Sequence, residues 1–462
     1  MQFALSLLLT RLLTPVEYGQ MGMILLFLLV GQTFADSGLA AGLVQRDEIS
    51  DDDETTVFYA NLVLGLVVAG LLCAASPLVA SFFGQPVLLP LLCVCSIGVF
   101  ITSLGIVQQA LLTRAVEFRT QAKVALLGAL GGGLVGVTMA WNGCGVWSLA
   151  GQSVAGAAVN LTALWAFSPW RPRGRFRRES LRRLWPFSSK LLASGLLHTT
   201  FENVHPLVIA RFYAADQVGF YTRASTLAAL PATSAAGMAH RVMFPVFARV
   251  QRDADALRDE LRRVVRTTVV PYFPVLVGLA AVSEPLVRTL LTERWIPCVP
   301  YLRILCATCL LYPIHALHMS ALMAQGRSGR FLRLEVVKKV LALAALAVTI
   351  PFGVRAMVYG MLAHSLVCLV LNGACSRELL RYRFREQFAD VGGALLASAL
   401  MGGAVVALDV WSGLAGAWLL AAEVGAGALL YAVLVVLARS GWAADFWRIT
   451  SRAARARAGA RG

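Results

Sequence analysis

The sequence has few charged residues: Asp, Glu, Lys and Arg make up 14% of its 462 residues, whereas 58% are hydrophobic. A soluble domain carries roughly 25% charged residues and about 45–50% apolar ones. The mean hydropathy of +0.70 departs from soluble proteins in the same direction. This scarcity of charge argues against a string of soluble domains and favours one continuous membrane domain.

The sequence also lacks the motifs of an enzyme. It has no P-loop, so we expect no ATP hydrolysis, and no Ser/His/Asp order or pair of catalytic carboxylates in a recognisable loop. The nine cysteines show no metal spacing, because Cys306 and Cys309 stand alone inside an apolar stretch. The segment Met1–Leu13 lacks the basic start and the cleavage site of a signal peptide. We therefore expect a protein that is not an enzyme and that holds no metal or cofactor.

Long apolar stretches run through the whole chain. A hydrocarbon core of roughly 30 Å is crossed by about 20 helical residues, and open sheets cannot face lipid. The sequence therefore predicts an all-α polytopic membrane protein with about fourteen transmembrane helices, the first of them short. The predicted stretches are 1–13, 19–44, 55–82, 87–112, 124–142, 145–168, 187–212, 218–246, 267–290, 299–324, 334–351, 356–375, 390–410 and 414–438.

The net charge of +16 is unevenly distributed among the connecting segments. Arginines gather after the even-numbered stretches, with seven of them in 171–183, whereas the opposite loops hold little beyond Arg294 and Arg355. This asymmetry follows the positive-inside rule. It predicts a multi-pass membrane protein with both termini in the cytoplasm, and it argues against nucleic acid as a partner. The acidic segment 46–54 is the exception.

An internal repeat divides the chain. Residues 10–21 align without gaps on 210–221, so that Arg11 matches Arg211 and Gly19 matches Gly219. Six helices separate the copies, and such parallel repeats are typical of transporters. We predict an N-terminal six-helix bundle (1–168), a basic cytoplasmic linker (169–186), a second six-helix bundle (187–375), two extra helices (390–438) and a basic cytoplasmic tail (439–462). Comparison of the two copies indicates that the first helix lacks about 13 residues at its beginning. Either the true start of the protein lies upstream, or this copy is truncated.

Two segments carry a family resemblance. The first is Leu9–Gln45, and the second, Leu207–Gln251, contains G-x-Y-x-R-A, then a proline, then F-P-x-F-x-R-x-Q. Over roughly residues 8–385 the chain resembles Wzx-type polysaccharide flippases, in particular the colanic-acid exporter branch of the lipopolysaccharide biosynthesis transporters. The resemblance implies the multidrug/oligosaccharidyl-lipid/polysaccharide exporter (MATE-like) fold, with two bundles around a central cavity.

The resemblance also implies a cargo, an undecaprenyl-pyrophosphate-linked oligosaccharide that is flipped across the inner membrane for lipopolysaccharide, capsule or exopolysaccharide synthesis. Membrane lipids, the polysaccharide polymerase and the chain-length machinery are the partners expected with it. Coupling to a proton or sodium gradient, or to the membrane potential, is expected in place of a cofactor. The alternative function is a cation-coupled small-molecule (multidrug) antiporter of the same superfamily.

Ionisable residues inside the membrane cost at least about 2.5–3.5 kcal/mol on insertion scales, so each one asks for a reason. Two sets of such residues are candidates for the site. Cations that could hold the pyrophosphate, or instead snorkel to the membrane surface, are Arg223, Arg211, Arg11 and Lys190. Groups for coupling or gating, or instead for structural hydrogen bonds, are Glu202, His198 and Asp36, of which His198 and Glu202 share one helix face.

We expect Arg223→Ala to abolish polysaccharide export, because the substitution removes a cation from the path of an anionic head group. Membrane insertion should be unaffected. The measurements are the amount of surface polysaccharide and the amount of protein in the membrane fraction. Normal surface polysaccharide in this variant would remove Arg223 from the site.

Overall fold

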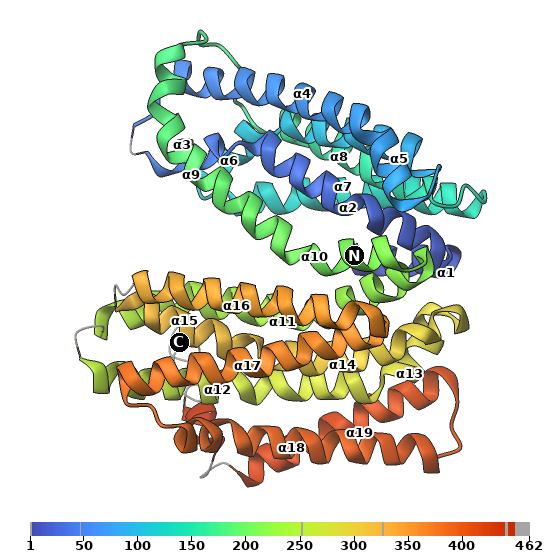
Figure 1. Cartoon of the computed structure of the whole chain (residues 1–462), viewed down its shortest axis with the longest axis vertical. Helices are drawn as coiled ribbons and strands as arrows, with labels where there is room; N and C mark the ends of the chain where they lie inside the picture. The colour runs from blue at the N-terminus through green and yellow to red at the C-terminus, as the bar shows by residue number, and fades with distance from the viewer. Residues whose placement is uncertain (1, 47, 251–252, 326–327, 439–441, 449–462) are drawn as a thin grey trace, which may run out of the picture. The chain divides into compact units, whose positions relative to one another are not determined.

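The computed structural model describes residues 2–46, 48–250, 253–325, 328–438 and 442–448, which form helices and connecting segments but no strand (Figure 1). The all-α prediction is therefore confirmed. The helices up to the repeat junction are α1 (Gln2–Leu12), α2 (Pro15–Asp36), α3 (Leu39–Gln45), α4 (Asp51–Phe83), α5 (Leu88–Ser103), α6 (Ile106–Arg114), α7 (Phe118–Trp141), α8 (Trp147–Phe167), α9 (Arg178–Glu202) and α10 (Val204–Phe212). The later ones are α11 (Ala215–Val250), α12 (Ala254–Ala281), α13 (Ser283–Leu286), η1 (Val287–Leu291), η2 (Glu293–Cys298), α14 (Val299–Leu310), α15 (Tyr312–Ala324), α16 (Ser328–Thr349), η3 (Ile350–Phe352), α17 (Val354–Leu380), α18 (Phe384–Trp411) and α19 (Gly416–Leu437).

Each predicted apolar stretch corresponds to one helix or to a helix with a break. Local backbone chemistry explains two of the breaks: Ser37 and Gly38 adopt left-handed conformations between α2 and α3, and Pro313 stands in the first turn of α15. Among the described residues, eight helices are long and apolar enough to cross a membrane, or nine if the bent pair α5 and α6 is one span. The count of about fourteen spans stays a prediction.

The chain divides into two compact units, Met1–Thr222 and Arg223–Gly462. In the first unit, α7 and α8 pack through small residues. A Cβ atom on Gly132 would lie 2.5 Å from the Gln152 carbonyl oxygen, and one on Gly128 would lie 3.0 Å from Asn160 Cβ. Such contacts are the usual way for helices to pack closely in lipid.

Helices α9 and α10 also pack within the first unit, on α2 and α4, with α9 on α3 as well. A Cβ atom on Gly38 would lie 2.7 Å from the Ser188 carbonyl oxygen, so the loop between α2 and α3 closely approaches α9. The sequence assigned 187–212 to the second bundle. The division into two six-helix bundles stays a prediction.

The acidic segment that departed from the charge rule is the first turn of α4. Acidic groups there complement the positive end of the helix dipole. The basic linker lies against this turn: Arg177 forms an ion pair with Asp52 at 2.6 Å, and Trp170 Nε1 donates to Glu54 Oε2 at 2.5 Å. Asp52 and Glu54 are thus partners of the linker, which accounts for acidic residues beside this basic segment.

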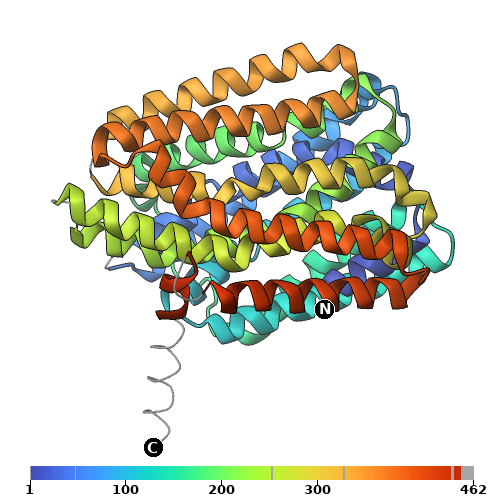
Figure 2. The ribbon, with the colours of Figure 1, turned by 90° about the horizontal axis from the view of Figure 1, so that it is seen from below.

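In the second unit, a buried carboxylate ties α12 to α18. Asp390, whose side chain is fully buried, accepts hydrogen bonds from Arg262 (2.8 Å), Arg266 (2.7 Å) and the Tyr382 hydroxyl (2.8 Å). Burial, and then the neighbouring Asp390 charge, raise the pKa of Tyr382, so its phenol stays protonated and donates. Figures 1 and 2 show α18 and α19 side by side at the edge of this unit.

The internal repeat has matching helix boundaries. Helix α1 ends at Leu12 and α10 at Phe212, whereas α2 begins at Pro15 and α11 at Ala215, so the offset of 200 residues is kept. Within the first unit the two glycines of the repeat lie at the crossing of α2 with the start of α11. A Cβ atom on Gly19 would lie 1.7 Å from the Ala215 carbonyl oxygen, and one on Gly219 would lie 2.0 Å from that of Pro15. The repeat thus places a glycine from each copy where two backbones touch.

We expect Gly219→Ala to lower the stability of this packing by about 1–3 kcal/mol, the usual cost of overpacking, because backbone atoms cannot move aside as a side chain can. The measurement is the unfolding temperature of the purified protein in detergent. Gly70→Ala in α4 is the control, because a Cβ atom there would meet nothing within 4 Å. Equal unfolding temperatures for the two variants would contradict the tight crossing.

Candidate functional site

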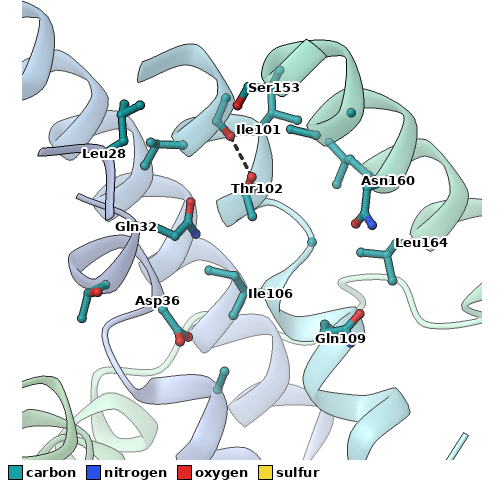
Figure 3. Close-up of a pocket in the computed structure, with 18 of the residues that line it drawn as sticks. Leu28, Gln32, Asp36, Ile101, Thr102, Ile106, Gln109, Ser153, Asn160 and Leu164 are labelled. Atoms are coloured by element: carbon teal, nitrogen blue, oxygen red, sulfur yellow. Dashed lines mark hydrogen bonds between the residues drawn. The ribbon is translucent and has the colours of Figure 1, made fainter. Parts of the chain in front are cut away.

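The first unit contains a pocket of about 940 Å³, with walls formed by α2, α3, α5, α6, α7 and α8 (Figure 3). Sites for small organic ligands commonly measure about 300–1,000 Å³, so this pocket lies near the upper end of that range. Its walls are mainly apolar, and polar side chains from five helices (α2, α5, α6, α7 and α8) project into it. These polar lining residues are Gln32, Thr33, Asp36, Thr102, Gln109, Thr113, Gln121, Ser153 and Asn160.

The hydroxyl groups of the threonines are bound to their own helices. Thr33 donates to the Leu29 carbonyl oxygen at 2.8 Å, and Thr102 donates to that of Gly98 at 2.8 Å. These bonds fix the side-chain rotamers. The Thr33 oxygen also lies 3.3 Å from the Thr199 hydroxyl, and Thr113 accepts from Gln121 Nε2 at 3.0 Å. Thr102 therefore presents a fixed acceptor to a ligand.

Five other polar side chains make no hydrogen bond within the described part of the chain: Gln32, Asp36, Gln109, Ser153 and Asn160. Figure 3 shows them around the same space. An amide offers two donors and an acceptor, a hydroxyl offers both roles, and a carboxylate accepts. The pocket can thus bind a ligand with many hydroxyl groups. Among the described lining residues, Asp36 is the only charged one.

Helical spacing brings these residues together. Gln32 and Asp36 are four residues apart on α2, and Ser153 and Asn160 are seven apart on α8, so each pair shares one helix face. The sequence interpretation selected residues by charge and therefore missed Gln32, Ser153 and Asn160. The signal that could have found them is the recurrence of polar residues on one face of an apolar helix.

The structure places one of the seven predicted site residues in this pocket, namely Asp36. Arg223 is buried, with 4% of its surface exposed, in α11 at the start of the second unit. The other five predicted residues are exposed: Arg11, Arg211, Lys190, His198 and Glu202. Their roles stay predictions.

Arg211 stacks on an aromatic ring. Its guanidinium carbon lies 4.9 Å from the ring centroid of Phe82, near the end of α4. A cation over an aromatic face is a favourable contact. This contact fits a structural role for Arg211 at the end of its helix, the alternative to binding the pyrophosphate. The predicted cations are thus absent from the described lining of the first-unit pocket, which is uncharged apart from Asp36.

Comparison with known sequences places the chain among proteins of polysaccharide synthesis. The model of a family described as polysaccharide biosynthesis protein matches residues 8–300. The lipopolysaccharide biosynthesis protein WzxC of Escherichia coli K12 is 28% identical over 74% of this chain and 70% of the relative. The succinoglycan biosynthesis transport protein ExoT of Rhizobium meliloti is 28% identical over 66% of this chain, which spans 62% of the relative's length.

Comparison with solved structures identifies the fold. A structure of the lipid II flippase MurJ in an inward closed conformation superposes with a TM-score of 0.74, covering 95% of this chain and 97% of that one at 13% identity. An inward-facing multidrug transporter of the MATE family gives 0.65 over 82% and 95%, at 16% identity. The predicted MATE-like fold is therefore confirmed, and the chain is a multi-pass helical membrane protein.

Proposed function

The chain belongs to the polysaccharide biosynthesis protein family, and we propose that it flips a lipid-linked oligosaccharide across the cytoplasmic membrane of a bacterium. The relatives named for lipopolysaccharide and succinoglycan synthesis support a polysaccharide precursor as the cargo. The fold shared with a lipid II flippase supports the movement of a lipid-linked sugar, because that protein handles cargo of the same chemical kind.

The pocket of the first unit carries the proposal. A sugar presents many hydroxyl groups, each both donor and acceptor, and the pocket presents five polar side chains that make no hydrogen bond in the described chain. Uncharged amides and hydroxyls bind sugars without the desolvation cost of burying ions. We assign the oligosaccharide to this pocket, with Gln32 and Asn160 on opposite walls as its main contacts.

The anionic part of the cargo requires cations. We propose that the pyrophosphate is held by Arg223 with Arg211, Arg11 and Lys190, as the sequence predicts. The distribution of arginines supports an inner-membrane protein with both termini in the cytoplasm. The transported repeat units would then pass to a polymerase and its chain-length machinery, and an ion gradient or the membrane potential would drive the cycle.

One observation favours the alternative function, a cation-coupled antiporter of small molecules. Such a transporter needs an acidic group in its cavity, and Asp36 is the only charge in the described lining of the pocket. Deletion of the gene separates the two functions. Lipid-linked intermediates that accumulate on the inner leaflet support the flippase, whereas unchanged intermediates with altered dye efflux support the antiporter.

We expect the double variant Gln32→Ala, Asn160→Ala to flip the lipid-linked oligosaccharide roughly 10- to 30-fold more slowly at low substrate concentration. Each lost hydrogen bond contributes about 1 kcal/mol. The measurement is the flipping of a fluorescent lipid-linked oligosaccharide in proteoliposomes. Asn142→Ala, which removes an exposed amide at the end of α7, is the control. Unchanged flipping in the double variant would remove the sugar from this pocket.

A further inference from the structure

The second unit buries a lysine that no part of the proposed function uses. Lys338 lies in the middle of α16, and only 11% of its side chain is exposed. An ammonium group inside a membrane protein is costly, and it persists only with a partner or a function. Lys338 is therefore a place where a change of charge would have large structural consequences.

Glu335, one turn earlier in α16, compensates this charge by an ion pair with Lys338. It is the only carboxylate within ion-pair distance of Lys338 in the described part of the chain. The ammonium also contacts the Met319 sulfur of α15 at 3.6 Å, a weak acceptor. The two partners differ in access, because 31% of the Glu335 side chain is exposed. The carboxylate is thus the more exposed member of the pair, and the ammonium is the more buried one.

The groups around the pair cannot replace the carboxylate. Lys339 follows Lys338 in α16. His364 and Cys368 face the pair from α17. His315 faces it from α15, which also carries His318. The His364 ring donates through Nε2 to the Lys338 carbonyl oxygen at 2.9 Å, since a carbonyl only accepts. The Asn372 amide donates to His315 Nδ1 at 3.1 Å, so the His315 ring is neutral. None of these side chains supplies a negative charge.

We propose that Glu335 and Lys338 form a proton-binding switch in the second unit, an inference that rests on the proposed transport function for its purpose. One proton from water adds to a carboxylate oxygen of Glu335 and breaks the ion pair. The Lys338 ammonium is then buried beside a thioether and side chains that carry no negative charge, which strongly disfavours this packing of α15, α16 and α17. Proton binding thus favours another arrangement of these helices, as coupling to a proton gradient requires.

The first test measures hydrogen exchange in α15–α17 of the purified protein at about pH 4 and about pH 7, on either side of the ordinary glutamate pKa of about 4.3, corrected for the chemical exchange rate. The wild type should exchange roughly threefold faster in acid, because a proton binds Glu335 more readily once the ion pair is broken. Glu335→Gln, which mimics the protonated carboxyl, should exchange fast at both pH values. The double variant Glu335→Gln, Lys338→Met removes both charges and should exchange slowly at both. Wild-type pH dependence in Glu335→Gln would overturn the proposal.

A matched control exists between the same helices. Arg330 of α16 and Glu378 of α17 form an exposed ion pair at 2.7 Å. Exposed pairs contribute little to stability, so Arg330→Gln with Glu378→Gln should keep the exchange pattern of the wild type and its pH dependence. If this variant loses the pH dependence as Glu335→Gln does, the switch is not located at the buried pair and the proposal fails.

The second test separates the switch from the proposed function. In proteoliposomes with the fluorescent lipid-linked oligosaccharide, a pH gradient should stimulate flipping by the wild type and should not change the rate of Glu335→Gln, whatever rate that variant has without a gradient. Stimulation equal to the wild type would overturn the switch. A wild type that moves no lipid-linked oligosaccharide contradicts the proposed function alone, because the hydrogen-exchange result still decides whether the proton-binding pair exists.

Discussion

A buried charge is costly in a membrane protein, because lipid offers no water to solvate it. Asp390 shows the fully compensated case, with two arginines and a phenol around one carboxylate. Lys338 shows the minimal case, with one carboxylate and a sulfur. The stronger network holds α12 to α18, whereas the weaker pair lies on α16. The neighbouring helices α15 and α17 are joined to each other by hydrogen bonds between histidine and serine side chains.

The pocket of the first unit meets the same constraint in another way. It is built from amides, hydroxyls and a single carboxylate, so it offers hydrogen bonds without burying a set of charges. Small residues make the packing around it close: Gly132 lies against α8, as does Gly128. The hydrogen-bonding groups are thus mounted on closely packed helices, which keeps them in place for a ligand.

Much of the fold could be predicted because its cause is local. Apolar length predicts the helices, and the repeat predicts the equivalent junctions before Pro15 and Ala215, where the helix boundaries agree. The candidate site was less predictable, since ranking residues by charge found Asp36 and missed Gln32 and Asn160. The pairing of Asp52 with Arg177 could not be predicted either, because it joins residues 125 positions apart and depends on how the linker lies on α4.

The two units offer different chemistry, and this difference bears on how transport would be driven. Groups free to bind a neutral, hydroxyl-rich ligand lie in the first unit, where Asp36 is the one charge in the described pocket lining. In the second unit, the buried ion pair is adjacent to His364, whose ring donates to the Lys338 carbonyl oxygen, and to the neutral ring of His315. A sugar bound through hydrogen bonds perturbs no ion pair directly. Coupling of its movement to a proton therefore requires a separate ionisable element whose stability depends on helix packing, and the pair of Glu335 and Lys338 has that property.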